Sequence, residues 1–292
     1  MEASDILRRV RRLEFRTRRA VNEFAPGAYL SLFRGRGVEF ADIREFQSGD
    51  DARILDWRAT ARLGRPVVKR FVEERELTLM LLVDGSASTR CSATYERLLE
   101  LVAIFAFSAL RNHDQVGAML FTSVPERIVA PAQGRHHAHR LLRELVTHEP
   151  TQPGTDLGAA LEAAHRSARR GTVFVVLSDF LDPAFDGALR RVALRHDLVA
   201  VRVHAARPHQ PPAGVWINLA DAESGQTALL SPSQAPDLAE AANERGRALD
   251  RRLRTAGAEV LALNEIDDPV PLLAHFLSRR RGTRSRSRGV RP

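Results

Sequence analysis

Two short apolar runs, each leading into an acidic residue, limit the folds open to this chain more than any other feature. Residues 77–83 lead directly into the pentapeptide Asp84-Gly85-Ser86-Ala87-Ser88, and residues 172–178 lead into Asp179. Short apolar runs bounded by turn residues are typical of buried strands. Because open α/β sheets bind ligands at the carboxyl ends of their strands, both runs predict polar groups at a ligand-binding edge.

Strand and helix patterns alternate through the rest of the chain. Strands are expected at 77–83, 115–121, 172–178, 198–204 and 259–263, with a short one near 127–130. Helices are expected at 95–111, 136–146, 156–170, 184–196, 237–256 and 271–279, and a hairpin near Ser224-Gly225. Strands that alternate with helices of this length imply right-handed crossovers. The fold class predicted is therefore α/β, with a doubly wound, mostly parallel sheet.

The two ends of the chain differ from this regular part. Apolar residues spaced by three and four between Ile6 and Phe24 predict an amphipathic helix, and residues 28–75 read as loops and short strands. Residues 279–292 hold seven arginines and no acid, and disorder is expected there. The predicted division is an N-terminal subdomain at 1–75, an α/β domain at 76–278 and an arginine-rich tail at 279–292.

Composition excludes several classes of protein. Hydrophobic residues make up 44% of the 292, enough for a sizeable core. The longest apolar stretch, 101–110, is too short to span a bilayer, and the N-terminus lacks a signal-peptide pattern, so a cytoplasmic protein is expected. A single cysteine, Cys91, allows neither an intrachain disulfide nor a thiolate metal site. The tail carries most of the net charge of +8, so no specific nucleic-acid surface is expected on the folded part.

The oxygen-bearing residues after the apolar runs suit a hard divalent cation. Asp84, Ser86 and Ser88 would need further oxygen ligands, and two neighbouring loops offer them. Thr155 lies in a loop just before a predicted helix, and Asp179 follows the most apolar strand. Oxygen ligands without Cys or His favour Mg²⁺ or Mn²⁺. An open position on such a metal could be filled by a carboxylate from another protein.

The order Asp-x-Ser-x-Ser, then Thr155, then Asp179 resembles the metal-ion-dependent adhesion site of von Willebrand factor type A domains. The resemblance implies a type A-like fold of the Rossmann kind. It also implies that Ser86, Ser88 and Thr155 ligate the metal directly, whereas Asp84 and Asp179 act directly or through water. The resemblance therefore implies a site that binds proteins and is not catalytic.

A second resemblance comes from the N-terminal region. It is carried by residues 33–46, Ser48-Gly49-Asp50-Asp51, Asp56-Trp57-Arg58, residues 65–71 and residues 73–76. These segments are similar to the bacterial domain-of-unknown-function family numbered fifty-eight, in which a type A domain follows directly. That family is associated with MoxR-type AAA+ ATPases, and its members are thought to act as adaptors or co-chaperones. The resemblance implies a non-enzymatic adaptor whose metal grips an acidic residue of a MoxR-type ATPase or of its client.

Other interpretations stay open. Asp84, Ser86 and Ser88 could merely cap a strand end, since Asp and Ser favour turns. A metal-dependent phosphohydrolase could use Asp84 as a nucleophile, although such an enzyme would need an acid where Ser86 stands. Asp50, Asp51 and Asp56 could form a second acidic site or serve as turn and salt-bridge residues. The arginine tail could bind nucleic acid or anionic lipid.

Overall fold

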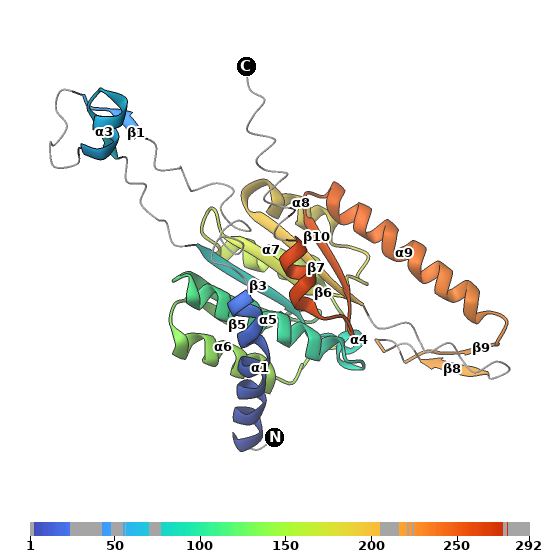
Figure 1. The fold of residues 1–292 in the computed structure, drawn as a ribbon. Coiled ribbons are helices and arrows are strands. Elements are labelled where there is room, and N and C mark those ends of the chain that lie inside the picture. The colour runs from blue at the N-terminus through green and yellow to red at the C-terminus, as the bar shows by residue number, and fades with distance from the viewer. Residues whose placement is uncertain are drawn as a thin grey trace. The chain divides into compact units, whose positions relative to one another are not determined.

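A computed structural model gives the fold of the protein (Figure 1). It describes residues 3–23, 43–47, 55, 57–69, 77–204, 216–220, 222–223, 225–276 and 279. The chain divides into two compact units, one formed by Met1–Phe33 with Leu77–Pro292 and the other by Arg34–Glu76. Each unit is described by itself.

The larger unit is built on a six-stranded sheet. Its strands are β3 (Thr78–Asp84), β4 (Gln115–Phe121), β5 (Pro125–Ala132), β6 (Val173–Ser178), β7 (Asp197–His204) and β10 (Glu259–Asn264). They lie in the order β10-β7-β6-β3-β4-β5. Every neighbouring pair is parallel except β4 and β5, so β5 is an antiparallel edge strand. The predicted doubly wound, mostly parallel α/β fold is confirmed.

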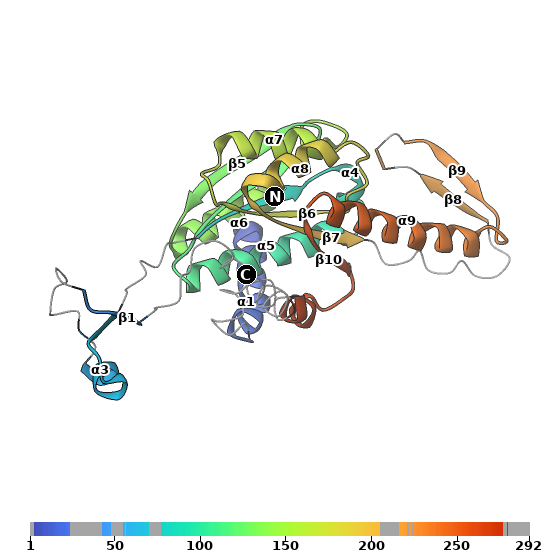
Figure 2. The same cartoon turned by 90° about the horizontal axis from the view of Figure 1, so that it is seen from above.

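Helices cover both faces of this sheet (Figure 2). One face carries α5 (Thr94–Arg111), α6 (Arg135–Thr147) and α1 (Ala3–Glu23), and the other carries α7 (Leu157–Ser167), α8 (Asp186–Arg195) and the end of α9 (Ala235–Thr255). Successive side chains along each strand point to opposite faces of the sheet, so the strands contribute to two separate cores. In β3, Leu79 and Leu81 join the first core, whereas Met80 and Leu82 join the second. Because both faces are covered, the central strands are apolar along their whole length.

Helix α1 belongs to the larger unit. Its Val10 and Leu13 are buried in the first core, where α1 packs against α5 and α6. Glu14 on the same helix pairs with Arg135 at 2.8 Å and with His139 at 3.2 Å, both on α6. The smaller unit ends at Glu76, next to the boundary predicted at residue 75, but α1, predicted as part of the N-terminal subdomain, belongs to the larger unit because its apolar face is buried against the main core.

The smaller unit contains β1 (Ile43–Glu45), α3 (Trp57–Leu63) and β2 (Val67–Lys69), with β1 and β2 antiparallel. Thr60 on α3 accepts a 3.1 Å hydrogen bond from the Val67 amide, which ties the helix to the strand. Short strands were expected here. Asp50, Asp51 and Asp56 lie outside the described residues, and so do the structural details of the tail beyond residue 279.

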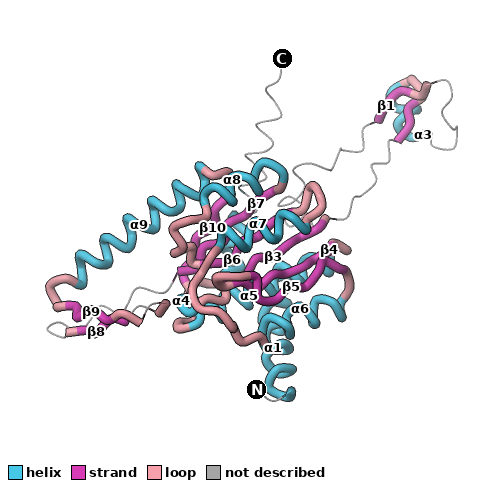
Figure 3. Tube along the Cα trace, turned by 180° about the vertical axis from the view of Figure 1, so that it is seen from behind, coloured by secondary structure: helices cyan, strands magenta, loops and turns pink. Residues whose placement is uncertain are grey.

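A hairpin and a long helix complete the larger unit. Strands β8 (Ile217–Ala220) and β9 (Thr227–Leu230) pair antiparallel, which confirms the hairpin expected near Ser224-Gly225. Figure 3 shows this hairpin next to the start of α9. Within the described part of the chain, no helix combines the length and the apolar character that crossing a membrane requires. Short helix α4 (Ala87–Arg90) follows β3 directly.

Gly117 offers a test of the contact between β4 and the edge strand β5. A β-carbon at this position would lie 2.8 Å from both the Val129 carbonyl oxygen and the Pro131 nitrogen, which are backbone atoms. Backbone cannot move aside cheaply, so Gly117→Ala is expected to lower the free energy of unfolding by about 1–3 kcal/mol. Urea denaturation measures the change. Gly187→Ala is the control, because its β-carbon would meet only the flexible Arg191 side chain within helix α8. A Gly117 variant as stable as this control would contradict the prediction.

Candidate functional site at the carboxyl edge of the sheet

The predicted site residues lie where the strand order of the sheet reverses. From β3 the chain proceeds to β4 on one side, whereas β6 lies on the other side and leads outward to β7. In open α/β sheets such a switch point leaves a crevice at the carboxyl ends of the strands, where ligands bind. Asp84 is the last residue of β3, and Asp179 follows the last residue of β6.

Asp84 ties the two central strands together. Its side chain is fully buried, with 0% exposure. One carboxylate oxygen, Oδ1, accepts a 2.9 Å hydrogen bond from the Ser86 amide, and the other, Oδ2, accepts a 2.6 Å bond from the Ser178 hydroxyl. Ser178 in turn accepts from the Phe180 amide at 2.8 Å. Asp84 therefore shapes its own loop and the loop after β6.

The carboxylates at this edge have raised pKa values. Burial and the nearby charge of Asp179 raise the pKa of Asp84 to about 6, although the bonds from Ser178 and Ser86 favour its charged form. Burial also raises the pKa of Asp179, and the charge of Glu223 adds to that effect. A group of buried acids that destabilise one another's charge is a frequent feature of functional sites.

Two serine hydroxyls connect the loop after β3 to Asp179. The Ser86 and Ser88 hydroxyl oxygens are 3.1 Å apart, and Ser88 Oγ donates to Asp179 Oδ2 at 2.8 Å. Asp179 Oδ1 accepts from the Leu181 amide at 3.1 Å. Between them Phe180 adopts a left-handed backbone conformation, with φ of 58°. A non-glycine residue there is strained by about 1 kcal/mol, and such strain gathers at functional sites.

Thr155 joins the group from a third segment. Its hydroxyl lies 3.5 Å from Oε1 of Glu223, and the same oxygen accepts a 3.1 Å bond from the Ser88 amide. The next residue, Asp156, caps α7 by accepting from the Ala159 amide at 2.7 Å. All five predicted residues thus gather at one edge, with Thr155 linked to the others through Glu223. No sequence pattern indicated Glu223, because nothing local connects an acid in a hairpin turn to a distant sheet edge.

Glu126 on β5 holds the segment that leads to Thr155. Its carboxylate accepts hydrogen bonds from the amides of Thr151 and Gln152 at 3.0 and 2.9 Å, and from the hydroxyls of Thr151 and Thr122 at 2.8 and 2.9 Å. It also lies 3.1 Å from His148 Nε2. Burial acts to raise the pKa of Glu126, but these bonds outweigh it and lower the pKa to about 2. Sequence reasoning missed this residue, since most of its partners, in His148, Thr151 and Gln152, lie more than twenty positions away.

Arg90 links the loop after β3 to the same segment. Its guanidinium donates to the Gly85 carbonyl at 3.2 Å and to the His148 carbonyl at 2.9 Å, and it lies 4.1 Å from the centre of the Tyr95 ring. Arg90 is thus a positioning residue that fixes two of the three segments relative to each other.

The donor set is made of hard oxygen atoms. It comprises the carboxylates of Asp84 and Asp179 and the hydroxyls of Ser86, Ser88 and Thr155, a combination that suits Mg²⁺ or Mn²⁺. Among the described residues, no group of three or more His, Cys, Asp or Glu side chains forms a metal-binding cluster. A cation at this edge would therefore depend on the hydroxyls as well as the carboxylates.

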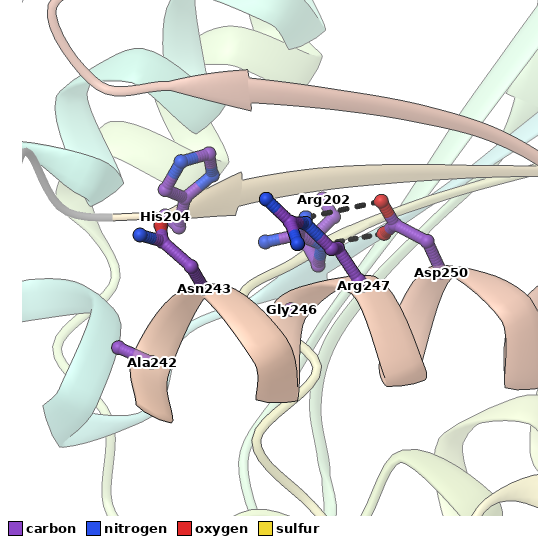
Figure 4. A pocket seen from close by; sticks show the side chains of 7 residues that line it. All are labelled: Arg202, His204, Ala242, Asn243, Gly246, Arg247 and Asp250. Carbon is purple, nitrogen blue, oxygen red and sulfur yellow. Dashed lines mark hydrogen bonds and ion pairs between the residues drawn. The ribbon is translucent and has the colours of Figure 1, made fainter. Parts of the chain in front are cut away.

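A separate polar cavity of about 240 Å³ lies beside the end of β7 (Figure 4). Arg202 on β7 points across it to Asp250 on α9, with hydrogen bonds of 2.8 and 3.3 Å. This partly buried ion pair joins α9, the helix that follows the β8–β9 hairpin, to the sheet.

The fold and the site together define a doubly wound α/β protein with an oxygen-rich group at its switch point. Residues 42–248 match the model of the family described as "Protein of unknown function DUF58". The chain belongs to this family. It is 33% identical to the uncharacterized protein Rv1480 of Mycobacterium tuberculosis (strain ATCC 25618 / H37Rv), across 94% of this chain and 89% of that protein. A 106-residue part is 32% identical to the uncharacterized protein YeaD of Bacillus subtilis (strain 168), across 36% of this chain and 25% of YeaD.

Two solved structures are similar to this chain at low sequence identity. The conserved hypothetical protein BatB from Bacteroides thetaiotaomicron is 13% identical, with a TM-score of 0.47, across 70% of this chain and 98% of BatB. The SpRpn10 VWA domain is 10% identical, with a TM-score of 0.38, across 70% of this chain and 95% of that domain.

Glu126 provides a pH test of the loop that carries Thr155. Its pKa is about 2 in the folded protein and near 4.5 without the fold, so its contribution is complete above about pH 4.5 and is lost as the pH falls towards 2. Glu126→Gln is expected to lower the free energy of unfolding at pH 7 by about 1–3 kcal/mol, since several amide and hydroxyl donors lose a charged acceptor. Denaturant titrations from pH 7 to pH 3 should show the difference from wild type shrinking. Glu149→Gln, exposed on the same segment, is the control. A difference that stays constant with pH would contradict the assignment.

Proposed function

We propose that this protein is a metal-dependent adaptor that binds another protein through a carboxylate. The observation that carries the proposal is the chain of hydrogen bonds from Ser86 to Ser88 to Asp179, at 3.1 and 2.8 Å, across the switch point of the sheet. Mg²⁺ or Mn²⁺ would be held by Ser86, Ser88 and Thr155, with Asp84 and Asp179 acting directly or through water. When bound, the metal would attract an acidic side chain of the partner.

The burial of Asp84 favours binding over hydrolysis. A nucleophile must reach its substrate, but Asp84 is 0% exposed and both of its oxygens already accept hydrogen bonds from Ser86 and Ser178. In this environment Asp84 supplies negative charge and loop shape. The function proposed is therefore that of an adaptor, and not that of a phosphohydrolase that uses Asp84 as its nucleophile.

An exposed leucine adds an apolar contact beside the acidic group. Leu181 is 65% exposed and stands two residues after Asp179, whose carboxylate holds its amide. Protein interfaces combine an apolar centre with a few placed polar groups. Leu181 would pack against the partner while the carboxylate of that partner enters the site.

The family association points to the kind of partner. The resemblance noted for the N-terminal region implies a MoxR-type AAA+ ATPase or its client, and the protein would meet it in the cytoplasm. This part of the proposal rests on family membership, whereas the acidic partner group rests on the site itself.

Removal of the Ser86 and Ser88 hydroxyls tests whether a divalent cation binds at this site. Ser86→Ala/Ser88→Ala is expected to weaken Mn²⁺ binding by about tenfold or more in calorimetric titrations, since loss of even outer-shell partners costs about 10–100-fold in metal affinity. Ser167→Ala is the control, because that hydroxyl donates only to carbonyls of its own helix. Equal Mn²⁺ affinity in the wild type and the double variant would refute the metal site.

A capture experiment tests the partner. The protein is used as bait in native lysate with Mg²⁺ or with EDTA. We expect it to capture a partner that is released by EDTA and is not captured by Ser86→Ala/Ser88→Ala.

Leu181→Ser is expected to weaken this capture without changing the affinity for Mn²⁺, because the Leu181 side chain is solvent-exposed and carries no metal-binding atom. A partner retained equally in every condition would refute metal-mediated recognition. Phosphoester turnover lost in Asp84→Asn would favour the hydrolase instead.

A further inference from the structure

The turn of the β8–β9 hairpin carries an acidic residue to the candidate site. Ala220 pairs with Thr227 in the last rung of the hairpin, so Glu223 lies in the connecting turn. The turn also contains Gly225 with φ of 69°, a conformation that glycine adopts without strain. The side chain of Glu223 is therefore presented from the end of a hairpin.

One oxygen of Glu223 meets two of the three segments that form the site. Glu223 Oε1 accepts from the Ser88 amide at 3.1 Å and lies 3.5 Å from the Thr155 hydroxyl. These partners stand 135 and 68 residues away in the chain, so the contact is tertiary. Both belong to the set that the proposed function assigns to the cation.

We propose that Glu223 is an acidic ligand that the chain itself supplies to the site, in the place of the partner's carboxylate. The inference rests on the proposed function and deepens it, because it names an internal competitor for the same position. An external partner would then have to present an acidic side chain from an exposed turn and displace Glu223.

Charge makes this docking dependent on a cation. Asp84, Asp179 and Glu223 bring three carboxylates to one edge of the sheet, and like charges at short range repel most strongly where water is excluded. A divalent cation held by the hydroxyls would offset that repulsion. Glu223 should therefore dock more firmly when Mg²⁺ is present.

The hairpin is separate from the six-stranded sheet. Strands β8 and β9 pair only with each other, in a two-stranded sheet. Helix α9, which follows β9, is held near its C-terminal end to β7 by the Arg202–Asp250 pair and to α8 by Arg252, which donates to Asp186 at 2.8 Å. A movement of the hairpin turn can therefore carry Glu223 away while these contacts stay in place. Exchange of one carboxylate for another then requires no rearrangement of the six-stranded sheet.

Hydrogen exchange at the Ser88 amide tests the docking in the full chain. In the wild type this amide should exchange more slowly in Mg²⁺ than in EDTA. In Glu223→Gln it should exchange faster by about tenfold or more, the change expected for losing one charge-assisted hydrogen bond, and Mg²⁺ should have little effect. Glu240→Gln removes the same charge from an exposed position on α9 and should behave as the wild type. Equal Ser88 exchange in the wild type and Glu223→Gln would overturn the inference.

Rescue with acetate tests the competition. In Glu223→Ala with Mg²⁺, added acetate should slow exchange at Ser88 again, whereas in the wild type it should change nothing. If Ser88 exchange depends on Glu223 but responds to neither Mg²⁺ nor acetate, the contact is merely structural and the inference is overturned. If Glu223 has no effect on Ser88 while Mn²⁺ binding still requires Ser86 and Ser88, the inference fails and the proposed function stands.

Discussion

The buried carboxylate of Asp84 is the contact on which the rest of the carboxyl edge depends. It joins the loop after β3 to the loop after β6 through the Ser86 amide and the Ser178 hydroxyl, at 2.9 and 2.6 Å. A buried carboxylate is costly unless hydrogen bonds satisfy it, and here both oxygens are satisfied. The same bonds turn Ser86, Ser88 and Asp179 toward one another. A charge that would otherwise oppose folding thereby organises the site.

Around this centre, residues that would not touch a ligand hold its segments in place. Glu126 gathers the amides and hydroxyls of the segment before Thr155, and Arg90 joins that segment to the loop after β3. Asp182 extends the same principle, since it accepts from the Leu157 amide at 2.8 Å and ties the start of α7 to the loop after β6. These hydrogen bonds anchor each loop to a strand or helix of the α/β body, and the rigid body keeps the geometry of the loops fixed.

The β8–β9 hairpin adds to the carboxyl edge an acidic residue that the six-stranded sheet and its own loops do not supply. The five predicted site residues belong to the α/β body, whereas Glu223 comes from an insertion between β7 and α9. A site made only by the body would hold two carboxylates, and that of Asp84 is fully buried. With the hairpin turn present, a third carboxylate lies against Ser88 and Thr155, and an acidic partner is proposed to compete with it. Membership of the DUF58 family identifies the chain, and the chemistry of this edge suggests what such a chain can bind.

The sequence by itself determined the fold class and which five polar residues would gather at the carboxyl edge, because both depend on short-range patterns. Apolar runs of strand length, alternating with helices, require a parallel sheet, and residues after the strands must lie at its carboxyl edge. Only the tertiary structure decided that Ser178 and Ser86 satisfy Asp84, that Glu126 and Arg90 hold the Thr155 segment, and that α1 packs with the main core. It alone brought Glu223 to Ser88, across 135 residues. These contacts join side chains far apart in the sequence, and the hydrogen-bonding partner of a buried or distant polar group leaves no periodic trace in the chain.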